Sequence, residues 1–134
     1  MTLKELSQLY HLNREIEMDQ RRLEELRAKA EGPSSGRLDG MPRSPNVEDK
    51  LARYVAEIVD LSVIISTKQL RCIHERNRLE RYIQDIPDSL TRQIFTLRFI
   101  NGLSWLQVAA SIGGNNTDKS VSKVCYRHLE NTGG

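Results

Sequence analysis

The sequence predicts an all-α protein, in which a long antiparallel helical hairpin of coiled-coil type is followed by a helix-turn-helix. Three observations lead to this prediction. Two long stretches carry apolar residues at alternating steps of three and four, a connector rich in glycine, serine and proline separates them, and the last third consists of short amphipathic segments punctuated by glycine. The expected domains are a helical region over residues 1–86, with a flexible loop at 31–45, and a helix-turn-helix domain over residues 87–134.

The composition suits exposed helices better than a thick globular core. Of the 134 residues, 38% are hydrophobic, 28% are charged and only 5% are aromatic. The formal net charge is +2, and residues 88–134 hold five Lys or Arg against three Asp or Glu, so positive charge leans weakly toward the C-terminal end. Cys72 and Cys125 lie far apart, no signal peptide opens the chain, and no apolar run reaches the roughly 20 residues of a membrane span. We expect a cytoplasmic protein with free thiols and no membrane contact.

Residues 2–30 are expected to form one long amphipathic helix. Its apolar stripe is interrupted at Asp19, and its other faces carry mixed charge with favourable pairs such as Glu17 and Arg21. Since a single helix cannot bury such a stripe, this helix needs a helical partner. The stripe consists of Leu9, Leu12, Ile16, Leu23, Leu26 and Ala30.

The partner helix is expected from about Val47 to about Asp85, with Asn46 as its N-cap. The β-branched cluster at 63–65 is assigned to this helix, because helical periodicity continues on both sides of it. The economical arrangement folds the first helix back along the second, and self-association of two chains through the same stripes, which gives a homodimer, is the alternative. The second stripe consists of Leu51, Tyr54, Ile58, Leu61, Ile65, Cys72, Leu79 and Tyr82.

Pro87 ends the second long helix, and the chain then changes to short helices. A helix over 88–100, capped by Asp88 or Ser89, is expected to end at Asn101-Gly102. Ser104 and Gln107 have the spacing of a capping box for the next helix, which Gly113-Gly114 ends. The apolar positions of these two helices are Leu90, Ile94, Leu97, Phe99 and Ile100, and then Leu106, Val108, Ala109 and Ile112.

The last helix is expected to begin at Asn116 or Thr117 and to have one apolar and one polar, basic face. Small Ala109 lets two helices cross closely, the glycines permit a sharp turn, and the polar start of the last helix can face bases and phosphates in the major groove. This combination predicts a helix-turn-helix, and a three-helix bundle without a DNA role is the plainer alternative. The inward residues are Val121, Val124, Cys125 and Leu129.

The segment RQIFTLRFINGLSWLQVAASIG resembles region 4 of bacterial sigma-70 factors, in which an LRF-x-x-G-LS stretch leads into a helix-turn-helix. With IPD upstream and WLQVAASIGGNNTDKSVSKVCYRHL downstream, residues 83–130 resemble small sigma-region-4-like regulators of phages and prophages of Gram-positive bacteria. The resemblance implies transcription regulation in a bacterial host cell, double-stranded DNA as ligand and RNA polymerase as a further partner. The distance from Gly113 to Val121 makes the turn about two residues longer than is common, which re-aims the last helix.

Carried over residue by residue, the resemblance assigns a DNA-facing set to the last helix. Lys119, Lys123 and Arg127 follow one another at steps of four and so share a helix face. Lys123 and Ser122 are expected near bases and Arg127 on a phosphate. The full set is Asn116, Thr117, Lys119, Ser120, Ser122, Lys123 and Arg127.

Other features receive plainer interpretations. Asp118 is expected to stabilise the first helical turn, and Trp105 to pack between helices, with an exposed partner-binding Trp as the alternative. The pairs Cys72/His74 and Cys125/His128 offer zinc ligands, but Cys72 and His74 point to different faces, so no metal or other cofactor is expected. A basic stretch either touches the DNA backbone or, as we favour, forms a solvated helix face; it consists of Lys68, Arg71, Arg76, Arg78 and Arg81.

The sequence therefore favours a DNA-binding transcription regulator of phage or prophage type, and not an enzyme, because no catalytic motif stands out. The long helices would serve dimerisation or contact with RNA polymerase. Two alternatives remain open. A phage DNA-packaging protein like a small terminase subunit also joins a helix-turn-helix to helical oligomerisation segments, and a helical adaptor would bind protein only.

Overall fold

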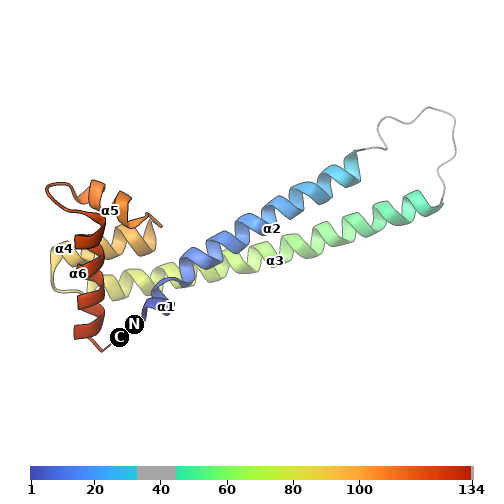
Figure 1. Ribbon diagram of the computed structural model, residues 1–134. Coiled ribbons are helices and arrows are strands. Elements are labelled where there is room, and N and C mark those ends of the chain that lie inside the picture. The colour runs from blue at the N-terminus through green and yellow to red at the C-terminus, as the bar shows by residue number, and fades with distance from the viewer. Residues whose placement is uncertain (33–44, 134) are drawn as a thin grey trace. The chain divides into compact units, whose positions relative to one another are not determined.

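The computed structural model describes residues 1–32 and 45–133, and within these ranges every regular element is a helix (Figure 1). The predicted all-α class is thereby confirmed. Most of the predicted 31–45 loop lies outside the described residues. The helix predicted to be capped by Asn46 already begins at Pro45, so Asn46 lies inside the helix and the N-cap prediction is wrong. The elements are α1 (Leu3–Leu6), α2 (Gln8–Glu31), α3 (Pro45–Gln84), α4 (Ser89–Phe95), a π-helix η2 (Thr96–Ile100), α5 (Trp105–Ile112) and α6 (Asp118–Asn131).

The long helices α2 and α3 pack antiparallel, which confirms the predicted hairpin (Figure 1). By packing, the chain divides into two compact units. One, here the hairpin unit, comprises Arg14–Leu70; the other, here the composite unit, combines Met1–Asn13 with Arg71–Gly134. The predicted domain boundary between residues 86 and 87 is placed between two expected functions, and it stays a prediction. The compact units instead meet between residues 13 and 14 and between residues 70 and 71.

In the hairpin unit, the predicted stripes form the contact between α2 and α3. Ile16 and Leu26 of α2 are buried, as are Leu61 and Ile65 of α3. The cluster at 63–65 is helical as predicted, and its Val63 points outward with 61% of its surface exposed. Helical periodicity therefore identified the buried faces correctly on both helices.

Asp19, which interrupts the first stripe, is matched by a cation on the facing helix. The Lys68 Nζ donates to Asp19 Oδ2 at 2.6 Å and lies 3.7 Å from Glu15 Oε2. The hydrogen bond to Asp19 raises the pKa of Lys68 above its usual value. Each charge of such a half-buried pair compensates the other, and removing one partner leaves the other charge unpaired in the seam.

In the composite unit, the first residues of the chain complete the core around the short helices. Leu6 and Leu9 are buried in one cluster with residues of α3, α4, η2 and α6. This arrangement is not evident from periodicity, because it joins segments that are some 70 or more residues apart. The other members are Leu79, Ile83, Ile86, Phe95, Phe99, Cys125 and Leu129.

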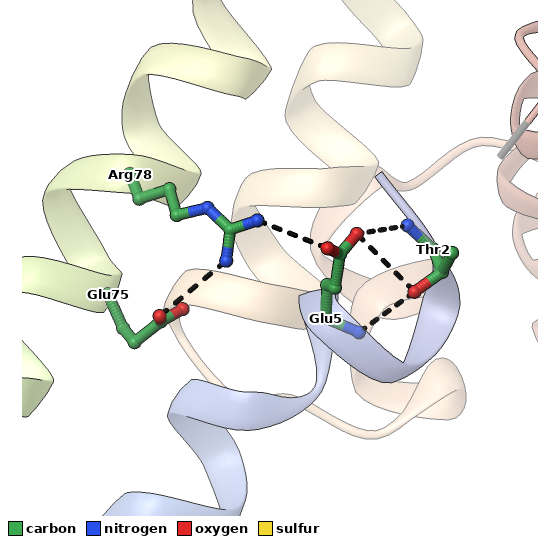
Figure 2. A network of polar contacts seen from close by, with 4 residues as sticks. All are labelled: Thr2, Glu5, Glu75 and Arg78. Carbon is green, nitrogen blue, oxygen red and sulfur yellow. Dashed lines mark hydrogen bonds and ion pairs between the residues drawn. The ribbon is translucent and has the colours of Figure 1, made fainter.

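Polar contacts fix α1 against α3 in the composite unit (Figure 2). The Thr2 N–H donates to Glu5 Oε2 at 2.8 Å while Thr2 Oγ1 accepts from the Glu5 N–H at 3.2 Å, which is a capping box. The guanidinium of Arg78 lies 3.2 Å from Glu5 Oε1 and 3.6 Å from Glu75 Oε1. The Thr2 N–H and then Arg78 hold the pKa of Glu5 below its usual value.

Three details of the helices differ from the predictions. The expected single helix over 2–30 is interrupted at Ser7, whose side chain donates to the Leu3 carbonyl at 2.9 Å. The helix over 88–100 changes into a π-helix at Thr96, and a wider turn rotates the residues that follow relative to an α-helix. Leu90 and Leu106, predicted as apolar inward positions, are 38% and 71% exposed, because each lies beside the buried arc of its helix.

Replacing Asp19 by Ala should lower the free energy of unfolding by about 1 kcal/mol, because Lys68 then stays half-buried without its nearest anion. Urea titration followed by circular dichroism measures this change. The double variant Asp19→Leu/Lys68→Leu should recover at least the wild-type value, since an apolar pair suits the seam. Equal loss in both variants would show that the pair does not act as described.

Burial in the core of the composite unit raises the pKa of the Cys125 thiol to about 12, so at pH 8 this thiol is protonated and shielded. Iodoacetamide at pH 8 should therefore alkylate the half-buried Cys72 first and leave Cys125 unmodified until the protein unfolds. Peptide mass spectrometry over time, with a denatured sample as control, measures both rates. Equal rates in the native protein would contradict this packing.

Candidate nucleic-acid interface

Helix α5 begins with the predicted capping box and packs on α6. The Ser104 Oγ accepts from the Gln107 N–H at 3.2 Å, and the Gln107 side chain accepts from the Ser104 N–H at 2.9 Å. Val108 and the small Ala109 are buried in one cluster with Ile94 of α4 and Val121 of α6. The cluster ties α6 to two preceding helices, so that the surface of α6 is presented on a fixed support.

The turn between α5 and α6 covers residues 113–117 and uses two glycines in the left-handed region. Gly113 has φ +80° and Gly114 has φ +66°, which an L side chain adopts only with strain. The Asn116 Nδ2 donates to the Gly113 carbonyl at 2.9 Å and so closes the turn. The predicted longer turn is thus ordered by its own hydrogen bonds.

The start of α6 is fixed by a second reciprocal cap. The Thr117 Oγ1 accepts from the Ser120 N–H at 3.1 Å, while the Thr117 N–H donates to Ser120 Oγ at 2.8 Å. The Ser122 Oγ donates to the Lys119 carbonyl at 3.0 Å. The uncharged members of the predicted DNA-facing set therefore have structural tasks, and they orient the helix whose cations lie further along.

The three predicted cations of α6 lie on its exposed side, and none forms an ion pair with a described residue. Lys119, Lys123 and Arg127 are opposite the buried positions of the helix, which include Val121 and Cys125. Asp118 lies in the first turn, where an acid favours the helix dipole as predicted. The face consequently offers three unpaired positive charges and a helix N-terminus to an anionic ligand.

Trp105 packs between helices, as predicted, and connects the face of α6 to η2. The Arg98 guanidinium lies 4.7 Å from the Trp105 ring centroid and donates to the Leu103 carbonyl at 2.9 Å. Tyr126 also contacts the Trp105 ring, with ring centroids 6.1 Å apart, and is 42% exposed. Sequence reasoning missed Tyr126 as part of this face, although its position three residues after Lys123 indicates it.

The remaining candidate sites contribute little to this face. Among residues 1–32 and 45–133, no three His, Cys, Asp or Glu side chains gather as metal ligands. In the basic stretch of α3, Lys68 is paired with Asp19, Arg76 with Glu80 at 3.1 Å and Arg78 with Glu5. Most of that stretch therefore neutralises neighbouring acids, in keeping with a solvated helix face.

Searches of protein-family models, of curated proteins and of solved structures return no match to this chain. None of the described helices combines the length and the apolar character that crossing a bilayer requires.

Replacing Thr117 by Ala should lower the free energy of unfolding by about 1 kcal/mol, because the N-cap of α6 loses its acceptor. The matched control is Thr67→Ala in the interior of α3, where Ala is the better helix former and stability should not fall. Thermal and urea unfolding of both variants compare the two sites. A Thr117 variant as stable as the Thr67 variant would contradict the cap.

Proposed function

We propose that this protein is a sequence-specific DNA-binding transcription regulator that places α6 in the major groove. The observation that carries the proposal is the exposed face of α6, where Lys119, Lys123 and Arg127 lie unpaired with any described acid on a helix held by α4 and α5. A helix of 14 residues supported in this way has suitable dimensions for the groove.

Each cation has a distinct expected role. The N-terminus of α6 and Lys119 approach backbone phosphates, since both attract anions at the start of the helix. Lys123 lies in the middle of the face and reaches base edges together with Ser122 at the half-buried side of the face, and Arg127 contacts a further phosphate. The capped turn over 113–117 sets the angle of approach, so Thr117 and Asn116 act as positioning residues.

The modest charge predicts modest affinity for one copy of the module. Release of counterions from the two phosphates that Lys119 and Arg127 neutralise gives a slope of about −1.8 for log K against log salt concentration. Glu130 lies near the end of the same helix and limits contact beyond Arg127. Paired binding sites would supply the affinity that a single module lacks.

The resemblance to sigma region 4 also indicates the kind of cell and the partner with which this regulator would act. It supports a regulator of phage or prophage origin that acts in the cytoplasm of a bacterial host, with RNA polymerase as a second partner. The long helices offer surface for that partner or for a second chain.

The test is selection of bound sequences from random double-stranded DNA at two salt concentrations. The wild-type protein should enrich a discrete site, and Lys123→Ala/Arg127→Ala should lose it with an affinity loss of about tenfold or more. The matched control Arg27→Ala/Lys29→Ala removes the same charge from exposed positions of α2 and should retain the site.

Each outcome has a definite meaning. Salt-sensitive binding without sequence preference would replace regulation by a packaging or architectural role. No binding by the folded protein would overturn groove docking and leave a helical adaptor. Equal loss in the control variant would show that net charge, and not the face of α6, accounts for binding.

A further inference from the structure

The hairpin unit has a second apolar face on α3, on the side opposite to its contact with α2. Val55, Val59, Val63 and Leu70 are 50%, 57%, 61% and 59% exposed, whereas Leu61 and Ile65 of the same helix are buried against α2. Between residues 52 and 70 this exposed arc contains no charged side chain. A solvated helix face normally carries charge, so this arc is unusual for a surface.

The exposed arc follows a heptad. Ala52, Ala56, Val59, Val63, Ser66 and Leu70 are separated by alternating steps of four and three, over about three heptads and roughly 27 Å of helix. Alanine and serine allow close approach of the helices, and the β-branched Val63 falls at an a position, where such residues favour two strands.

The polar residues beside this seam tolerate burial. The Ser62 Oγ donates to the Ile58 carbonyl at 2.7 Å, and the Thr67 Oγ1 donates to the Val63 carbonyl at 2.9 Å. Both hydroxyls thus keep a partner within their own helix when water is excluded. Covering the face therefore creates no unpaired donor at these positions.

An uncharged apolar heptad of this kind suits cover by a second helix that carries the same pattern.

We infer that the occupant is a second copy of this protein, with the two α3 helices parallel and in register. In a parallel pair, Glu48 of one chain lies beside the seam, opposite Arg53 of the other chain. The twofold axis repeats this contact on the other side of the seam. Both side chains are exposed and form no ion pair with a described residue.

This inference stands independently of DNA binding. If the regulator proposal also holds, parallel pairing means that in both chains residues 71–134 continue from the same end of the paired helices. Two such copies suit a DNA site made of two half-sites. Failure of either proposal leaves the other intact, because one concerns the face of α6 and the other the outer face of α3.

Sedimentation of the full-length chain from micromolar to sub-millimolar concentration tests the pairing. The wild-type protein should be a dimer, and Val63→Glu should weaken the dimer by about tenfold or more, because two carboxylates enter an apolar seam. Met18→Glu is the matched control: Met18 is 64% exposed on α2, away from the seam, and its variant should dimerise like wild type. A wild-type monomer throughout, or equal effects of both variants, would overturn the inference.

A charge swap tests the parallel direction. Glu48→Lys and Arg53→Glu should each weaken its own homodimer, on the order of threefold, by placing like charges opposite each other. A mixture of the two variants should favour the heterodimer, in which both flanking pairs are again of opposite charge. Native mass spectrometry of the mixture measures the species, and a statistical distribution would overturn parallel pairing.

Discussion

The burial of Leu6 and Leu9 in the core of the composite unit is the contact on which the rest of that unit depends. The helices α4, η2, α5 and α6 contain 7, 5, 8 and 14 residues, and segments of this length are marginal without tertiary packing. The inward residues Cys125 and Leu129 of α6 belong to the same cluster as Leu6 and Leu9. The first residues of the chain thus support the helix proposed to enter DNA.

Two apolar clusters hold α6 at different points along its length. Val121, near its start, packs with Ile94, Val108 and Ala109, whereas Cys125, further on, packs with the cluster that includes α1. Contact at both levels restricts rotation of the helix about its axis. The direction in which Lys123 points is consequently a property of the whole composite unit, and the caps at Thr117 and Ser104 refine it.

Much of the fold was predictable because it rests on local signals. Alternating steps of three and four identified the buried faces of α2 and α3, and the spacing of Ser104 to Gln107 identified the start of α5.

The packing of Leu6 against residues more than 70 positions away was not predictable, since periodicity indicates which face of a helix is buried but not which residues it packs against. The π-helix at Thr96 carries no recognised signature, and the exposed arc of α3 becomes meaningful only once the opposite face is known to contact α2. For the candidate site, the cations could be placed from spacing, whereas the contact of Tyr126 with Trp105 joins two helices and could not.

Native-state hydrogen exchange of the Leu6→Ala variant tests the central claim most directly. Truncation of this fully buried side chain should cost about 3 kcal/mol, and the account predicts that the amides of α6 lose protection by the same amount as those at the end of α3. A variant in which residues 71–84 lose protection while α6 keeps the wild-type exchange rates would contradict the claim. It would show that the helix-turn-helix is stable without the first residues of the chain.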